Sequence, residues 1–324
     1  GPGSLFDGGV AVLDSPPIGS ASLGLEIVGE PGDLATASQT LDWTPTWKGR
    51  KHAGWATVAR DLIQLTKPRI VGMILVTTVA TAMIAAGGPV AIGPMALLLI
   101  ATGMVAGSAG GANQIWERVI DTRMARTMIR PLPSQRLSIE LATAFTASIG
   151  PLGVALLWIG VGPVPAAVGL ATWVLYVFLY TPMKTRTSWN TTVGAVSGAL
   201  PMLIGYTALG GSLSDPVGWL LFGVLAAWQY PHFMAIAWLY RRQYDEAGFR
   251  MSTTVEPTGR SAAFQSVTGS LAVIGCGTGL CFTGPGVVAT ALASLAVSAA
   301  TLPMLKASIR FASDRNDVTA RRLL

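Results

Sequence analysis

The chain has 324 residues, of which 51% are hydrophobic and only 12% are charged. This composition is too apolar for a soluble domain of that size and indicates a polytopic membrane protein. A formal charge of +6 would suit nucleic-acid binding in a soluble protein, but here the positions of the charges matter more than their sum, so we expect no nucleic-acid partner. Cys276 and Cys281 lie in one apolar run and predict neither a disulfide nor a metal site.

The amino-terminal part of the chain differs from the rest in composition. Residues 1 to about 60 mix Gly, Pro, Ser and Ala with scattered acids and show no periodic apolar segment, which predicts a disordered cytoplasmic tail. Gly-Pro-Gly-Ser at residues 1–4 is typical of a remnant of protein engineering and is left out of the fold prediction. We expect a membrane domain over residues 61–310 and a cytoplasmic segment over residues 311–324.

Eight apolar runs are long enough to cross, or nearly cross, a bilayer, and they predict an all-α membrane bundle. The runs are Ile70–Ala86, Pro94–Ala112, Ser138–Trp158, Val164–Tyr180, Thr192–Leu209, Val217–Trp238, Ser261–Phe282 and Val287–Leu305. Alternate connections, at residues 87–93, 159–163, 210–216 and 283–286, contain no Lys or Arg. The basic residues lie in the other connections, which the positive-inside rule makes cytoplasmic together with the amino terminus. The polar chemistry is therefore expected at the cytoplasmic ends of the helices.

A dense polar pattern follows the second apolar run. Asn113, Glu117 and Asp121 recur every four residues and would form one polar edge of an α-helix. Such oxygen ligands suit Mg²⁺, which binds through one or two carboxylates, water and substrate phosphate. Arg126 and Arg130 follow at the same spacing, and guanidinium groups match phosphate oxygens. The alternative is a helix end laced with i,i+4 ion pairs, but ionisable groups beside a membrane span are candidates for function.

Two later segments add polar residues at the same ends. Lys184 and Arg186 follow the fourth run, where they could bind phosphate or serve only as topology determinants. His232 lies in the apolar sixth run, where it could be a hydrogen-bonded structural group, a ligand or an acid–base group.

Several longer signatures occur in a fixed order. They are Leu-Thr-Lys-Pro-Arg (65–69), the stretch 113–132 ending in Arg-Thr-x-x-Arg-Pro-Leu, Tyr-Thr-Pro-x-Lys (180–184) with Asn190, Gly-Ala-x-x-Gly-Ala-x-Pro (194–201) and Trp-Gln-x-Pro-His-Phe (228–233). Through them the region from about Thr66 to Arg322 resembles the haem O synthase (protohaem IX farnesyltransferase) family of intramembrane prenyltransferases. The resemblance implies a Mg²⁺-dependent enzyme of a bacterial-type inner membrane, which transfers farnesyl from farnesyl diphosphate to a vinyl group of haem b with addition of water.

The resemblance also implies roles and partners. The catalytic residues would be Asn113, Glu117, Asp121, Lys184 and His232. The metal ligands would be Asn113, Glu117 and Asp121, with Gln243 and Asp245 as further candidates. The diphosphate would be bound by Arg126, Arg130, Lys184 and Arg186, and the haem or other acceptor by Tyr180, Asn190, Trp228 and His232. The partners would be farnesyl diphosphate, haem b and the lipid bilayer, and the family adds a downstream haem A synthase.

Two departures and two alternatives accompany this prediction. Gln243 stands where relatives commonly carry an acid, and relatives usually continue past a segment like Ala320-Arg-Arg-Leu into a ninth span. A related enzyme acting on an aromatic or quinone acceptor is the first alternative, but its motif typically begins Asn-Asp, whereas Gln114 follows Asn113 here. A non-catalytic haem or lipid carrier is the second, and clustered carboxylates argue against a site for haem propionates.

Overall fold

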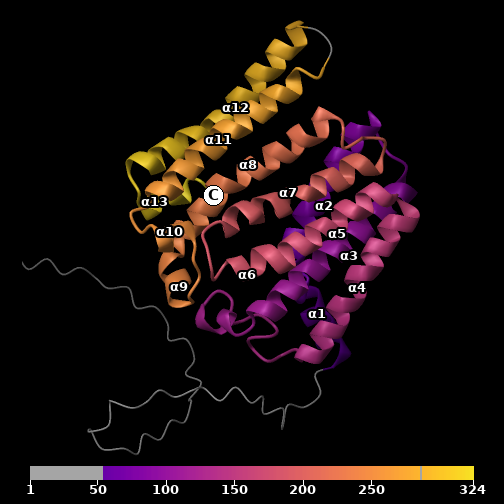
Figure 1. Cartoon of the computed structure of the whole chain (residues 1–324), viewed down its shortest axis with the longest axis vertical. Coiled ribbons are helices and arrows are strands. Elements are labelled where there is room, and N and C mark those ends of the chain that lie inside the picture. The colour runs from indigo at the N-terminus through magenta and orange to yellow at the C-terminus, as the bar shows by residue number, and fades with distance from the viewer. Residues whose placement is uncertain (1–53, 285–286) are drawn as a thin grey trace, which may run out of the picture. The chain divides into compact units, whose positions relative to one another are not determined.

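The computed structural model describes residues 54–284 and 287–324, in which helices and turns are the only elements (Figure 1). The long helices are α2 (Pro68–Ala86), α3 (Ile92–Glu117), α4 (Ile139–Gly160), α5 (Pro163–Val174), α7 (Asn190–Ala208), α8 (Pro216–Leu239), α11 (Arg260–Cys281) and α12 (Val287–Ser313). The short elements are α1 (Trp55–Leu65), the 3-10 helix η1 (Ile120–Arg123), the π-helix η2 (Leu175–Tyr180), α6 (Thr181–Met183), α9 (Arg241–Glu246), α10 (Ser252–Val255) and α13 (Asp317–Arg321).

The predicted all-α membrane bundle is confirmed, and each predicted apolar run overlaps one long helix or helical stretch. Seven helical stretches among the described residues are long and apolar enough to cross a membrane. The remaining predicted run corresponds to α7, which is as long as α2 but carries more polar residues and is mostly buried within the bundle. The count of eight spans is therefore not confirmed. Most of the predicted tail lies outside the described residues, and α1 begins at Trp55, before the boundary expected near residue 60.

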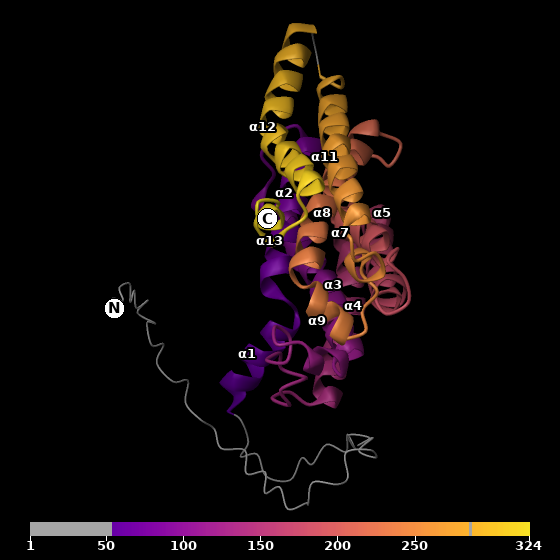
Figure 2. The same cartoon turned by 90° about the vertical axis from the view of Figure 1, so that its left-hand side faces the viewer.

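The helices pack as two groups that meet along α7 and α8. In the first group α3 lies along α4, and α7 contacts α2 and α5; in the second, α11 lies between α8 and α12 (Figures 1 and 2). Leu98, Leu157 and Leu203 are buried at the centre of the first group, while Met234 and Phe311 are buried in the second. Packing of these apolar side chains leaves the polar helix ends to form the site.

Close helix approach in the first group depends on glycines of α3. A Cβ atom at Gly111 would lie 2.6 Å from Thr146 Oγ1 of α4, which is closer than such atoms can pack. A Cβ at Gly110 would lie 3.1 Å from the backbone oxygen of Thr66, which lies at the junction between α1 and α2. Small residues at these positions therefore bring α4 and the start of α2 onto the polar end of α3.

The π-helix η2 results from the proline that follows it. Pro182 has no N–H to donate, and its ring would clash with the carbonyl four residues earlier in a regular α-helix. The Thr181 hydroxyl instead donates to the Tyr176 carbonyl at 2.8 Å. The wider turn places Tyr180, Thr181 and Lys184 at the polar end of the bundle, consistent with the frequent occurrence of π-helical turns at functional sites.

Candidate active site

The first polar motif begins on α3 but does not stay on it. Asn113 and Glu117 are buried in the last turns of α3, one turn apart on the same face. The helix ends at Glu117, and Asp121 lies on η1, where it is fully buried. The predicted continuous helix edge from Asn113 to Asp121 is therefore wrong after Glu117, because the chain turns at η1. The tighter 3-10 turn still buries Asp121.

Each oxygen-bearing residue of this motif has a cationic partner. Lys184 Nζ lies 2.8 Å from Glu117 Oε1, and Arg130 Nη1 lies 2.6 Å from Asp121 Oδ2. Lys67 Nζ donates to Asn113 Oδ1 at 2.5 Å. Both predicted carboxylates are thus brought together with two of the four predicted diphosphate cations, Lys184 and Arg130. We call this group the paired cluster; its members are Lys67, Asn113, Glu117, Asp121, Arg130 and Lys184.

Lys67 belongs to this group although the predicted site residues do not include it. It caps α2 in a left-handed conformation, with φ of 58°, which is uncommon for a residue other than glycine. Its Nζ also lies 3.5 Å from the Tyr176 hydroxyl. Backbone strain of this kind gathers at functional sites. The sequence signal was its place in Leu-Thr-Lys-Pro-Arg, directly before the first span.

The electrostatic surroundings shift the titration of these groups in different directions. Burial, reinforced by the nearby Lys184 ammonium, lowers the pKa of Lys67 to about 7. Burial would also lower the pKa of Lys184, but the Glu117 carboxylate together with Tyr180 and Tyr176 outweighs burial and raises this pKa above its ordinary value. Burial raises the pKa of Asp121, although Arg130 opposes that shift. Charge at this site is therefore held by neighbouring charges rather than by solvent.

Arg126 contacts the segment that follows α8. Its Nη2 donates to the Tyr244 hydroxyl at 3.2 Å, and its guanidinium lies 5.0 Å from the centre of the Tyr240 ring. Tyr244 is buried on α9, whereas Asp245 beside it is exposed and Gln243 is half-buried. Tyr244 is a second residue that the sequence prediction missed, and its signal was its place next to Gln243.

The Asn190 side chain connects two loops. Its side-chain amide donates to the carbonyls of Thr187, at 2.6 Å, and Arg250, at 3.0 Å. The Arg250 N–H in turn donates to the Lys184 carbonyl at 2.7 Å. Arg186, on the same loop, is exposed. The structure therefore places Asn190 behind Lys184 as a support, and it leaves Arg186 outside the paired cluster.

Trp228 and His232 lie together on α8. Their rings stack with centres 5.0 Å apart and 14° between planes, as expected for residues one helical turn apart. The Nδ1 atom of His232 is buried and has no hydrogen-bond partner among the described residues. Helix α8 packs mainly on α7 and α11, so no direct packing joins it extensively to α3. That His232 faces the same cavity as Asn113 remains a prediction.

Comparison with known proteins places this arrangement in a family. Residues 74–324 match the model of the UbiA prenyltransferase family. The chain belongs to this family. A curated relative from Rhodopirellula baltica, named protoheme IX farnesyltransferase, is 58% identical over 267 residues, covering 81% of this chain and 93% of the relative. A relative of the same name from Solibacter usitatus is 40% identical over 224 residues, covering 66% and 76% of the two chains.

Solved UbiA structures share the fold at low sequence identity. A digeranylgeranylglyceryl phosphate synthase structure aligns with a TM-score of 0.67 at 14% identity, covering 82% of this chain and 91% of the other. A UbiA homologue from Archaeoglobus fulgidus, described as bound to DMAPP and Mg²⁺, aligns with a TM-score of 0.64 at 13% identity, covering 78% and 87%. These likenesses confirm the polytopic helical architecture for this UbiA family member.

The first motif of this UbiA chain contains residue types that could hold a magnesium ion. Asp121 Oδ1 is buried with no hydrogen-bond partner among the described residues, so one ligand oxygen is available beside the paired one. Within the described ranges, no group of three or more His, Cys, Asp or Glu side chains is arranged to hold a metal ion. Two carboxylates and an amide fit Mg²⁺ that takes its other ligands from water and phosphate.

The arginine beside Asp121 permits a test of phosphate recognition. Arg130→Lys keeps the positive charge but loses the planar fork that fits phosphate oxygens. We expect the Michaelis constant for the prenyl diphosphate to rise about ten-fold, in line with loss of one charged hydrogen bond. Steady-state kinetics of the purified variant would show this. An unchanged constant and rate would exclude Arg130 from phosphate recognition and leave it only its ion pair with Asp121.

Proposed function

We propose that this UbiA family member transfers a farnesyl group from farnesyl diphosphate to a vinyl group of haem b with addition of water, giving haem O and diphosphate. The observation that carries the proposal is the 58% identity, over most of both chains, to a relative named protoheme IX farnesyltransferase. The carboxylates and the cationic side chains paired with them at the end of α3 are the groups that would bind a metal ion and diphosphate.

The chemistry follows from the charges at this site. Departure of the allylic diphosphate leaves negative charge on its oxygens, and Lys184, Arg130 and Lys67 offer cations to stabilise that charge. Asn113, Glu117 and Asp121 would hold Mg²⁺, which neutralises the diphosphate and makes it a better leaving group. The acceptor vinyl group and the farnesyl chain are apolar, which suits a reaction among membrane helices.

Gln114 separates the proposed reaction from its nearest rival. Its Nε2 donates to the Leu65 carbonyl at 2.7 Å, so its side chain ties α3 to α1. The related enzymes that act on aromatic or quinone acceptors typically carry an acidic residue at this place. This contact needs a donor, so the position suits the amide that distinguishes this chain from the aromatic-acceptor enzymes.

Product analysis tests the proposed reaction directly. Membranes that contain the full chain would be incubated with haem b, farnesyl diphosphate and Mg²⁺. The porphyrins would then be separated and identified by mass spectrometry. We expect the mass of haem O, with diphosphate released in equal amount. Formation of a prenylated aromatic or quinone instead would support the first alternative. Haem binding without any product would support a non-catalytic carrier.

The His232 imidazole is proposed to ligate haem iron and thereby fix which vinyl group meets the farnesyl cation. Its buried Nδ1, which has no hydrogen-bond partner in the described part of the chain, and its stacking on Trp228 support a ring that is free to bind a ligand. We expect His232→Ala to weaken haem binding and to shift the Soret band of the haem-loaded protein. If spectrum and affinity stay unchanged while turnover falls, the histidine acts on protons or water instead.

The membrane location and orientation of the protein, and the enzyme that would use its product, are also proposals. Basic residues collect at one end of the bundle, which the positive-inside rule makes cytoplasmic, in a bacterial-type inner membrane. The product would pass to a haem A synthase in the same membrane. Protease accessibility of the loop around Gly248 in inverted and right-side-out vesicles would test the orientation.

A further inference from the structure

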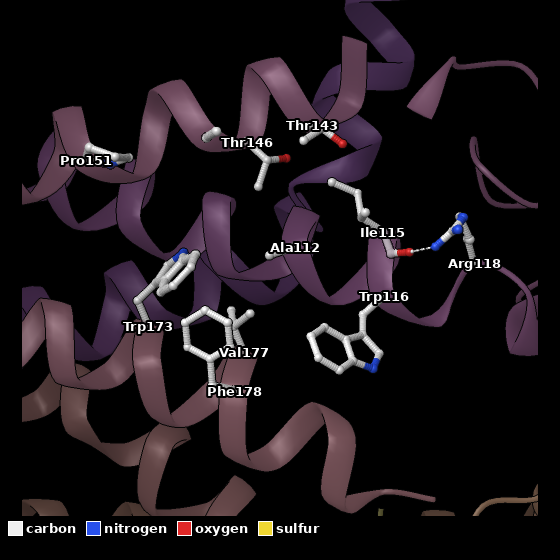
Figure 3. Close-up of a pocket in the computed structure, with 11 residues that line it drawn as sticks. Ala112, Ile115, Trp116, Arg118, Thr143, Thr146, Pro151, Trp173, Val177 and Phe178 are labelled. Atoms are coloured by element: carbon white, nitrogen blue, oxygen red, sulfur yellow. Dashed lines mark hydrogen bonds between the residues drawn. The ribbon is translucent and has the colours of Figure 1, made fainter. Parts of the chain in front are cut away.

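A groove runs along the outside of the bundle, away from the paired cluster. It has a volume of about 590 Å³ and is lined by α3, α4 and the stretch from α5 to η2 (Figure 3). Ala112, Ile115 and Trp116 form its α3 wall. At 100° per residue this wall lies roughly 130° around the helix from Asn113 and Glu117. The groove is therefore a different site from the one that holds the acids.

Among the described residues, Arg118 is the only ionisable one that lines the groove. Its Nη1 donates to the Ile115 carbonyl at 2.9 Å, as Figure 3 shows, and its Nε is buried without a hydrogen-bond partner among the described residues. No carboxylate in the described part of the chain lies within ion-pair distance of it. A guanidinium that has unused hydrogen-bond donors and lies beside apolar walls favours a ligand with an anionic group and an apolar chain.

The position of the groove matches one leaflet of a bilayer. Arg118 caps the end of α3 at the basic end of the bundle, and Trp116 beside it is half exposed, as tryptophans at a membrane interface are. On α4 the lining runs from Thr143 to Pro151, which at 1.5 Å per residue is about 12 Å, close to half of a hydrocarbon core of about 30 Å. A lipid head group bound at Arg118 would thus place its acyl chain within the hydrocarbon core of the same leaflet.

A second cavity continues the groove further along α4. It has a volume of about 470 Å³ and shares Pro151 and Trp173 with the first. Its other lining residues are apolar and extend to Trp158 and Ile159. A chain that enters beside Arg118 would pass Thr143 and Thr146 and then Trp173, beyond which the lining is apolar.

We propose that this groove is a binding site for an anionic phospholipid of the leaflet at the basic end. The head-group phosphate binds Arg118, and one acyl chain lies between α4 and η2 against Phe178 and Ala147. The site is independent of the prenyl transfer reaction, because its walls and those of the paired cluster are on different faces of α3. It gives the protein a preference for one class of lipid, beyond the general solvation of its apolar surface.

Native mass spectrometry of the full chain in a neutral detergent tests the site. The protein is offered an equal mixture of phosphatidylglycerol and phosphatidylcholine with the same acyl chains. We expect preferential retention of phosphatidylglycerol, and Arg118→Gln should lower that preference about five-fold, the factor that corresponds to about 1 kcal/mol per basic residue at an anionic surface. The matched control is Arg123→Gln, an exposed arginine on η1 outside the groove, which should retain the preference.

A second variant keeps the test independent of the arginine. Ala147→Phe fills the groove from an exposed position on α4 and should reduce the tightly bound lipid of both kinds. Equal retention of the two lipids by the unaltered protein, or equal effects of Arg118→Gln and Arg123→Gln, would overturn the proposal. Displacement of the bound lipid by farnesyl diphosphate would also overturn it, because the groove would then be a place for the substrate.

Discussion

Asp121→Asn should abolish prenyl transfer, lowering turnover by about three orders of magnitude, while the protein stays folded in the membrane. The amide keeps an oxygen for Arg130, which lies 2.6 Å from Asp121 Oδ2, so that contact is not lost outright. It removes the negative charge of a carboxylate whose buried Oδ1 has no hydrogen-bond partner among the residues that the structure describes. The effect should therefore fall on the chemistry and spare the fold.

The matched control is Glu140→Gln, which neutralises an exposed acid on the first turn of α4. Turnover of both variants would be measured over a range of Mg²⁺ concentrations, with thermal unfolding recorded for each. We expect wild-type kinetics for the control at every concentration. Wild-type turnover of Asp121→Asn, with no increase in the metal it requires, would remove Asp121 from the metal site.

Lys184→Gln should impair the enzyme in two separable ways. Glu117 would be left as an unpaired buried carboxylate, since its side chain is only 5% exposed, and loss of one partner from such a pair typically destabilises a protein by about 3 to 5 kcal/mol. Loss of a cation beside the leaving diphosphate should also lower turnover by about a hundred-fold or more. Unfolding in denaturant measures the first effect, and steady-state kinetics measures the second.

The double variant Glu117→Gln with Lys184→Gln separates the two effects. Two neutral amides side by side leave no buried charge, so most of the lost stability should return. Turnover should stay low, because neither the metal ligand nor the phosphate cation is restored. Recovery of turnover together with stability would show that the pair acts only in holding the fold.

The sequence predicted the helices well because membrane burial leaves a direct trace in hydropathy and in the placement of Lys and Arg. Helix α7 is the instructive case, since it lies inside the bundle and can carry Asn190 and several threonines that lipid would penalise. Burial against protein relaxes the demand for apolar residues, so hydropathy weakens for the helix at the centre of the bundle. The predicted tail boundary near residue 60 missed α1 because that helix is short and amphipathic.

The site was predictable in its residue types and less so in its geometry. Four-residue spacing correctly put Asn113 and Glu117 on one face, but nothing in the spacing signals that α3 stops before Asp121. Lys67 reaches Asn113 only through a left-handed turn whose cost is met by tertiary contacts. Tyr244 reaches Arg126 only because the two loops pack together. Such pairings depend on the whole fold and leave little trace in local sequence.

The backbone bond between the Arg250 N–H and the Lys184 carbonyl, 2.7 Å long, has a mechanical consequence. This bond joins the loop that follows α9 to the loop that carries Lys184, whose side chain pairs with Glu117. The Asn190 amide, which donates to the Arg250 carbonyl, reinforces the connection between the two loops. Separation of the two loops would therefore break the backbone bond that helps to position the lysine opposite Glu117.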